Sequence, residues 1–225
     1  LIGAEFPAFV RRVLPEAQIV MTLHDYYLIC AHDGLMMRTT GRERCHGASP
    51  DRCHGCFPEV AADQFLLRER YLKTLLTTVD RFVSPSAFLR DRFIAWCLDA
   101  DKIDVISNGQ PDGGRMPSLR EDGAPRNIFG YFGNLNPWKG GTVLLDAAER
   151  LIGSGTDFEL RIHGGTPFQA DAFKTELDER FARTSSHVVR RGPYRRQDVP
   201  SLMAAVDWVV VPSIWWENAP LVIQE

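Results

Sequence analysis

The chain has no hydrophobic run long enough to cross a membrane and no excess of positive charge. No apolar stretch approaches the roughly 20 residues that a membrane-spanning helix needs. The 26 Lys and Arg residues are outnumbered by 29 Asp and Glu residues, which leaves a net charge of −3. Without a basic field, the sequence does not indicate a nucleic-acid partner. We therefore expect a cytoplasmic protein that binds no nucleic acid, while peripheral contact with the inner face of a membrane stays open for the full-length protein.

The N-terminus also lacks the parts of a secretory signal peptide. Residues 1–7, Leu-Ile-Gly-Ala-Glu-Phe-Pro, contain no starting Met, no basic segment and no cleavage site. This start is typical of a chain entered within a domain, so we expect a fragment of a longer protein.

Strand and helix patterns alternate along the whole chain. With 44% hydrophobic residues, 225 residues are enough for one large or two smaller hydrophobic cores. The alternation predicts an α/β fold with parallel sheets. We expect strands at 18–23, 81–84, 103–107, 127–132, 158–162, 187–190 and 208–212, and helices at 59–79, 86–97, 142–152, 170–183 and 198–206.

A segment dense in Gly, Pro and charged residues divides this series of elements near residues 108–125. Such a composition is typical of a linker. We therefore expect one domain at 1–110, an interdomain linker at 111–126 and a second domain at 127–225.

A glycine-rich turn follows the first strand expected in the second domain. It contains Gly133, Lys139 and Gly140 and leads directly into a strongly amphipathic helix. The start of a helix presents backbone N–H groups and the positive end of the helix dipole, which together favour a phosphate. Lys139 would add a point charge for a diphosphate. Many α/β turns carry a lysine, so this pattern alone is a weak signal.

The chain ends on two glutamates, Glu217 and Glu225, with seven residues between them. They follow the strand expected at 208–212, and Pro220 stands near the start of a helix, where its missing N–H does little harm. A carboxylate at the carboxyl edge of a parallel sheet is well placed to bind a ligand. Carboxylates accept hydrogen bonds from sugar and ribose hydroxyls. The alternative is that one glutamate caps the helix and the other is a solvated charge.

Six segments, in order, make the chain resemble a family 4 glycosyltransferase. That family has the two-domain GT-B architecture, and the resemblance implies two Rossmann-like lobes, both incomplete in this chain. The matching segments are 83–86, 105–109, 131–140, 163–165, Asp207 with its valine strand, and 217–225.

The resemblance also implies roles for particular residues. The lysine binds the donor diphosphate, the first glutamate contacts the transferred sugar and the second contacts the ribose. His24, at the end of the first strand, would lie near the sugar and the acceptor; alternatively it only shapes its turn. The implied catalytic residues are His24 and Glu217, and the implied donor-binding residues are Gly133, Asn134, Lys139, Gly140, His163, Gly164, Glu217 and Glu225. Many relatives carry Arg in place of Asn134, which brings no charge.

The function implied is transfer of a hexosyl unit from a nucleotide diphosphate-sugar to an acceptor hydroxyl, with retention of configuration and no catalytic metal. A carbohydrate or lipid-linked acceptor would place it in polysaccharide or cell-envelope synthesis. We expect the truncated chain to be inactive. The alternatives are a nucleotide-sugar epimerase of GT-B fold and a non-catalytic binding module held together by zinc.

Four cysteines form a cluster outside these motifs. Cys30, Cys45, Cys53 and Cys56 lie within 27 residues, and the last two form a C-x2-C pair. Four thiolates can bind one structural zinc ion. Disulfides and free thiols are the alternatives, although an intracellular setting disfavours disulfides. The fifth cysteine, Cys97, stands at an apolar position of an expected helix and is predicted to be buried.

Three further features invite a functional interpretation. Asp99 and Asp101 form a D-x-D pair, but they fall at a turn between a helix and a strand, and we predict no metal there. Arg195 and Arg196 are expected to be solvated surface charges. Trp216, beside Glu217, either lines the sugar site or packs in the core.

Overall fold

The computed structural model describes residues 3, 5–110, 116–117, 119 and 123–225, which form two compact units. Unit 1 consists of Leu1–Gly109 and Trp215–Pro220, and unit 2 of Gln110–Ile214 and Leu221–Glu225. A division at one linker therefore does not account for the chain, because a short segment near its end belongs to the first unit. Of the expected linker, residues 111–115, 118 and 120–122 lie outside the described residues.

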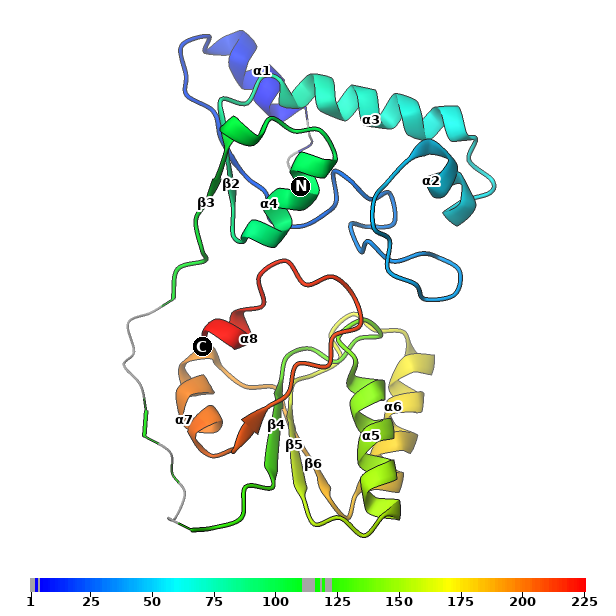
Figure 1. Cartoon of the computed structure of the whole chain (residues 1–225), viewed down its shortest axis with the longest axis vertical. Helices are drawn as coiled ribbons and strands as arrows, with labels where there is room; N and C mark the ends of the chain where they lie inside the picture. Colours follow the sequence, from blue (N-terminus) through cyan, green and yellow to red (C-terminus); the bar gives the residue numbers. More distant parts are fainter. Residues whose placement is uncertain (1–2, 4, 111–115, 118, 120–122) are drawn as a thin grey trace. The chain divides into compact units, whose positions relative to one another are not determined.

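Unit 1 contains a parallel sheet of three strands (Figure 1). Strands β1 (Val20–Thr22), β2 (Arg81–Ser84) and β3 (Ile103–Val105) stand side by side in that order. The expected strands are confirmed, although the outer two are shorter than predicted. Because the strands are parallel and in register, their carboxyl ends share one edge of the sheet.

The helices of unit 1 pack beside this sheet or against one another. They are α1 (Phe6–Val13), α2 (Pro50–Cys56), α3 (Ala62–Leu76) and α4 (Ala87–Ala95), with a 3-10 turn, η1 (Ala100–Lys102). The sequence did not indicate α1 or α2. Ser86 caps α4 as expected, since its Oγ accepts a hydrogen bond from the backbone N–H of Leu89 at 3.1 Å.

The prediction that Cys97 is buried in a helix is wrong. Helix α4 ends at Ala95, and Cys97 is exposed with a φ of 72°. The N–H of Cys97 donates to the carbonyl of Ile94, and the N–H of Leu98 donates to that of Phe93. This is the Schellman arrangement, in which the residue after the helix adopts the left-handed conformation.

Unit 2 contains a parallel sheet of four strands in the order β6-β5-β4-β7. These strands are β4 (Ile128–Phe132), β5 (Glu159–His163), β6 (Val188–Gly192) and β7 (Trp208–Val209). The helices are α5 (Gly141–Gly153), α6 (Asp171–Thr184), α7 (Val199–Ala204) and α8 (Leu221–Gln224), with a 3-10 turn η2 (Arg196–Asp198) before α7. Figure 1 shows α5 and α6 on one side of the sheet and α7 on the other.

The expected elements of unit 2 are largely confirmed, with one correction. Strand β7 has two residues, not the five expected at 208–212. One more hydrogen bond extends the pairing, because the N–H of Val210 donates to the carbonyl of Gly130. Further along the chain, the N–H of Ile214 donates to the carbonyl of Trp138 at 2.9 Å.

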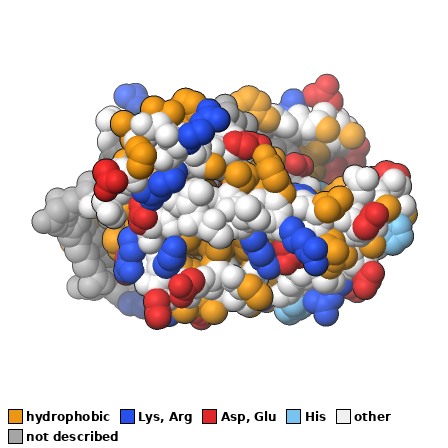
Figure 2. Space-filling model, turned by 90° about the horizontal axis from the view of Figure 1, so that it is seen from above, with side chains coloured by type: hydrophobic (Ala, Val, Ile, Leu, Met, Phe, Trp, Pro, Cys, Tyr) orange, Lys and Arg blue, Asp and Glu red, His pale blue; other side chains and the backbone are white. Residues whose placement is uncertain are grey.

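The surface that Figure 2 shows mixes side chains of both charges with apolar ones. Basic and acidic groups lie beside each other on this face, as the balanced composition leads one to expect. Among the described residues, none of the helices combines the length and the apolar character that crossing a membrane requires.

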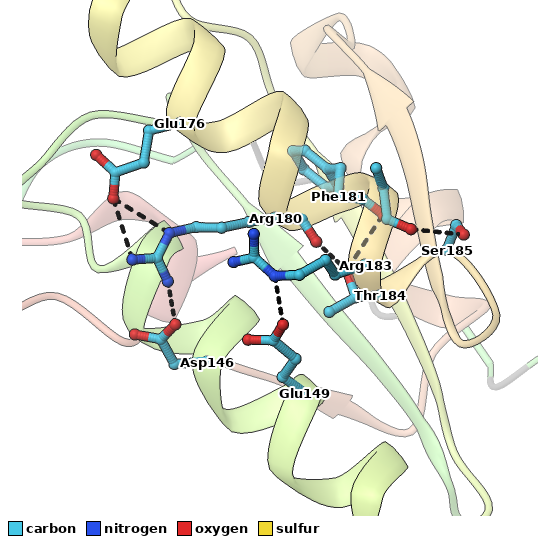
Figure 3. Close-up of polar contacts among 9 residues, drawn as sticks. Asp146, Glu149, Glu176, Arg180, Phe181, Arg183, Thr184 and Ser185 are labelled. Atoms are coloured by element: carbon cyan, nitrogen blue, oxygen red, sulfur yellow. Dashed lines mark hydrogen bonds and ion pairs between the residues drawn. The ribbon is translucent and has the colours of Figure 1, made fainter.

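The two long helices of unit 2 pack together through apolar side chains and are joined at the surface by ion pairs. Leu145 of α5 and Leu177 of α6 are buried in one core cluster. Arg180 bonds to Asp146 and Glu176, and Arg183 bonds to Glu149 (Figure 3). These charges are partly exposed, and such pairs contribute about 0–1 kcal/mol each. Burial of the apolar face is therefore the main stabilising term for this helix pair.

Gly140 is required where the chain enters α5. It has a φ of 73°, and a Cβ there would lie 2.0 Å from the carbonyl oxygen of Pro212. We expect Gly140→Ala to lower the free energy of unfolding by at least about 2 kcal/mol, since both the left-handed backbone and the contact oppose a side chain. Chemical denaturation monitored by circular dichroism measures this loss.

Gly153→Ala is the matched control. Gly153 ends the same helix, and a Cβ there would meet nothing within 4 Å. This change should leave stability unchanged or raise it by up to about 1 kcal/mol, because alanine favours the helix. Equal stability of the two variants would show that the close approach of Gly140 to Pro212 is not a constraint.

Candidate functional site

A pocket of about 360 Å³ opens where three neighbouring strands of unit 2 end. Phe132, the last residue of β4, pairs with His163 of β5, which pairs in turn with Gly192 of β6. The residue after each of these strands lines the pocket. The complete lining is Gly133, Asn134, Gly164, Gly165, Pro193, Tyr194, Arg196, Val199 and Glu225. The carboxyl edge of an open parallel sheet is where α/β proteins bind their ligands.

The floor of the pocket is formed by backbone atoms, because two loops of the chain approach each other too closely for a side chain between them. Gly133 and Gly164 have φ values of 148° and 152°, and a Cβ on Gly164 would lie 1.8 Å from the carbonyl oxygen of Gly133. The N–H of Gly133 donates to the backbone carbonyl of His163, and the N–H of Leu135 donates to the carbonyl of Gly165. A ligand entering the pocket therefore meets peptide groups of two adjacent loops.

The turn before α5 is held by a side chain that the sequence did not single out. Asn136 Oδ1 accepts hydrogen bonds from the N–H groups of Trp138 and Lys139, both at 2.9 Å. The expectation of free amides in this turn needs correction for these two groups, which already have a partner. Lys139 is half-buried in this turn and Gly140 caps α5, and neither is among the lining residues of the pocket.

His163 lies behind the wall of the pocket. Its side chain is 5% exposed, and its ring is stacked on that of Phe132 with centroids 4.8 Å apart. The edge of Tyr194, which does line the pocket, stands against both rings. Burial lowers the pKa of His163, and the positive charges of Arg191 and Arg161 lower it further. A neutral imidazole thus supports the aromatic wall.

The pocket carries a carboxylate and a guanidinium. Glu225 and Arg196 both line it, and Arg196 Nη2 donates to Gln110 Oε1 at 3.0 Å. Burial raises the pKa of Tyr194, and the negative charge of Glu225 adds to the effect. Arg196 is exposed, as expected of a solvated charge, and it also lines the pocket because it follows β6 by four residues.

Unit 1 brings together the two residues to which the resemblance assigns catalysis. The side-chain amide of Asn218 donates to the carbonyl of His24, and Ser86 Oγ donates to the carbonyl of Asn218. The Tyr26 hydroxyl donates to the carbonyl of Glu217 at 3.3 Å. The segment Trp215–Pro220 is thus fastened to residues that follow β1 and β2 at the carboxyl edge of that sheet.

The side chain of Glu217 accepts a hydrogen bond at Oε1 from the indole N–H of Trp215 at 2.9 Å. The imidazole of His24 is exposed, and Asp25 beside it caps its own turn by accepting from the N–H of Tyr27. Burial raises the pKa of Tyr26. Sequence reasoning missed Tyr26 and Asn218; the signal for Tyr26 was its place just after a strand that ends at the ligand edge.

The fold that these two units define is that of GT-B glycosyltransferases, an α/β architecture with two Rossmann-like parallel sheets. Residues 126–225 match the family model described as "Glycosyl transferases group 1". The second unit is therefore similar in sequence to that family. Among curated proteins, no sequence matches the chain significantly.

Several solved structures are similar to the chain at low sequence identity. HepE from Anabaena, in complex with UDP and glucose, is 22% identical with a TM-score of 0.58, over 92% of this chain and 48% of that one. Sucrose-phosphate synthase from Thermosynechococcus elongatus is 18% identical with a TM-score of 0.66, over 97% and 50%. A TarM variant from S. aureus is 16% identical with a TM-score of 0.52, over 69% and 29%. The chain thus spans half or less of the length of these proteins.

The buried His163 predicts an acid-dependent loss of stability. Since its pKa is lowered by folding, the unfolded chain binds a proton near pH 6.5 that the folded chain resists. Stability should therefore fall as the pH drops below about 6.5, by up to about 1.4 kcal/mol per pH unit from this group. The variant His163→Phe keeps a ring that can stack but has no titratable group. It should therefore lose less stability than the unchanged chain between pH 7.5 and about 5.5. Urea titrations at several pH values compare the two, and parallel curves would refute the assignment.

Proposed function

We propose that the chain is the part of a glycosyltransferase that binds a nucleotide diphosphate-sugar and positions its sugar for transfer to an acceptor hydroxyl. The observation that carries the proposal is the pocket of unit 2, where the first residues after three parallel strands meet a carboxylate and a guanidinium. The match of residues 126–225 to group 1 glycosyl transferases supports it. The UDP named with the HepE structures supports a nucleotide donor.

Each part of the pocket suits one part of such a donor. Glu225 accepts hydrogen bonds from the two ribose hydroxyls, because a carboxylate has two acceptor oxygens. The glycine-bounded loops at Gly133 and Gly164 let the diphosphate approach the backbone, and Tyr194 offers an apolar wall to the base. Lys139 is not a lining residue of the pocket; we propose that, from the turn that opens α5, it adds positive charge for the diphosphate.

Arg196 supplies the positive charge that Asn134 lacks. The two residues line the same pocket, and Asn134 has an amide where many similar glycosyltransferases carry an arginine. A guanidinium binds phosphate oxygens with two parallel hydrogen bonds. On this proposal the second cation for the diphosphate comes from the loop after β6, with Asn134 as a neutral donor.

The sugar-transfer step uses the residues of unit 1. Glu217 orients the transferred sugar, and His24 lies near the sugar and the acceptor hydroxyl. The hydrogen bond from Asn218 to His24 holds these two segments together, which supports their joint role. Stabilising the diphosphate as it leaves is electrostatic preorganisation, and it requires neither a covalent nucleophile nor a catalytic metal. We propose retention of the anomeric configuration because the family resemblance implies it. Without a covalent nucleophile, the acceptor oxygen would bond to the anomeric carbon on the face from which the diphosphate leaves.

The acceptor we propose is a carbohydrate or a lipid-linked sugar. The TarM variant is described in complex with α-GlcNAc-glycerol, and another similar structure is a galactosyltransferase of the lipopolysaccharide outer core. A nucleotide-sugar epimerase of the same fold is the second candidate. Release of free nucleoside diphosphate only when an acceptor is added separates transfer from epimerisation, which releases none.

The pocket predicts that this chain binds a nucleoside diphosphate more tightly than the nucleoside. Arg196→Gln should weaken diphosphate binding about tenfold to a hundredfold, the effect of one or two charge-assisted hydrogen bonds. Binding of the nucleoside should change far less. Calorimetric titration with a panel of nucleoside diphosphates and the corresponding nucleosides measures both.

Arg195→Gln is the matched control for this experiment. Arg195 precedes Arg196 and is equally exposed, but it is not among the residues that line the pocket. This variant should bind as the unchanged chain does. Equal losses from both substitutions would reduce the role of Arg196 to general surface charge.

The two glutamates should affect different steps in the full-length enzyme. Glu217→Gln should slow sugar transfer about tenfold or more while nucleotide binding is retained, because its carboxylate addresses the sugar. Glu225→Gln should weaken nucleotide binding, and Lys139→Ala should impair both steps. Single-turnover rates and titrations separate the effects. Equal small losses in all three variants would contradict the donor site, and acceptor-dependent turnover by the 225-residue chain alone would contradict the expectation that it is inactive.

A further inference from the structure

Four thiols of unit 1 surround one enclosed space. Cys30 ends the turn after β1, Cys45 follows the isolated bridge between Met37 and Arg44, and the pair Cys53 and Cys56 lies on α2. All four line a cavity of about 20 Å³ together with Met36, Met37, His32 and Phe57. A space of this size holds about one particle the size of a water molecule.

We propose that this space is a structural zinc site with Cys30, Cys45, Cys53 and Cys56 as its ligands. Cys53 and Cys56 stand one helical turn apart, so their side chains leave the same face of α2. Cys30 and Cys45 come from two other segments, which gives the separation in space that a tetrahedral ion needs. The cavity is otherwise lined mostly by apolar side chains, with Arg52 beside them. Cys30 is buried, and the other three cysteines are partly exposed.

Binding of zinc at this cluster would convert the four thiols to thiolates. Four thiolates facing each other without a cation would repel. A bound divalent ion reverses this, because each S–H bond breaks, its proton passes to solvent and a sulfur–zinc bond takes its place.

Two of the thiols are at present turned toward backbone carbonyls. Cys30 Sγ donates to the carbonyl of His32 at 3.9 Å, and Cys45 Sγ donates to that of Gly47 at 3.4 Å. In the part of the chain that the structure describes, no three Cys, His, Asp or Glu side chains are already arranged as a metal site. Loss of the thiol protons removes these hydrogen bonds, and rotation about the Cα–Cβ bonds then brings the sulfurs to a common distance of about 2.3 Å from the ion.

The site would fix a loop that has little regular structure of its own. Between Cys30 and Pro50, an isolated β-bridge pairs Met37 with Arg44. Met36, beside this bridge, is 1% exposed and has a φ of 50°. A non-glycine residue in that conformation is unfavourable and persists where the surroundings impose it. Disulfides are not what imposes it, since all five cysteines are unpaired.

The loop in turn holds the residue next to Glu217. Trp216 Nε1 donates to the carbonyl of Cys45 at 3.0 Å, and the guanidinium groups of Arg44 and Arg92 lie over its ring at 4.5 and 4.7 Å. Trp216 therefore packs in unit 1, against the core cluster and this loop. Zinc at the four thiols would position Trp216 and, through it, the backbone of Glu217; this consequence for activity rests on the function proposed above.

Metal content tests the site directly. The chain is purified without chelators or a histidine tag, and zinc is measured by mass spectrometry against protein concentration. We expect one zinc ion per unchanged chain. The control variant Cys97→Ser, which removes the exposed cysteine, should also hold one zinc ion per chain. The double variant Cys53→Ser/Cys56→Ser should hold less than about a tenth of a zinc ion per chain. His32→Gln should keep the ion, because Nδ1 of His32 is bonded to the carbonyl of Met37 at 2.8 Å.

Two measurements keep the test decisive if the double variant fails to fold. Cobalt added to the zinc-free chain should give the thiolate charge-transfer absorption and visible bands of a tetrahedral site. Zinc removal by a chelator should make four more thiols react than in the zinc-loaded chain. A chain that takes up neither metal and whose five thiols react at once would overturn the proposal, as would disulfides found by peptide mapping. These readouts do not involve unit 2, so nucleotide binding can fail or succeed independently.

Discussion

The close approach of two backbone loops at the end of the second sheet is the constraint on which the candidate site depends. Gly133 and Gly164 meet with too little space for a Cβ, and Gly140 meets the carbonyl of Pro212 in the same way. Because side chains are excluded there, peptide groups reach the surface of the pocket. These glycines therefore determine the shape of the backbone at this edge of the sheet.

The segment Trp215–Pro220 gives the molecule its second organising feature. It leaves unit 2 after Ile214, belongs to unit 1 and returns at Leu221. Its hydrogen bonds go to three backbone or side-chain groups that follow strands β1 and β2, and its tryptophan packs on the cysteine-containing loop. Glu217 and Glu225 thus belong to different units, although only seven residues lie between them.

Residues with local consequences were the most predictable from sequence. The strands at 81–84 and 127–132, the cap at Ser86 and the helix after Gly140 follow from periodicity and turn chemistry, which act over a few residues. Where a strand stops, or whether α1 and α2 form, depends on packing against distant segments. For this reason β7 is shorter than its valine pattern indicated, and Cys97 lies in a left-handed turn instead of a buried helix.

The sequence by itself determined the α/β class, the order of the strands along the chain and the candidates Gly133, Asn134, Gly164 and Glu225 that line one pocket. It could do so because parallel strands deliver the residues after them to one edge. Only the tertiary structure decided that Arg196 and Tyr194 join this pocket, that His163 stands behind it, and that four cysteines from three segments line one cavity. These are contacts between residues far apart in sequence, and no local pattern encodes how a loop closes over a sheet.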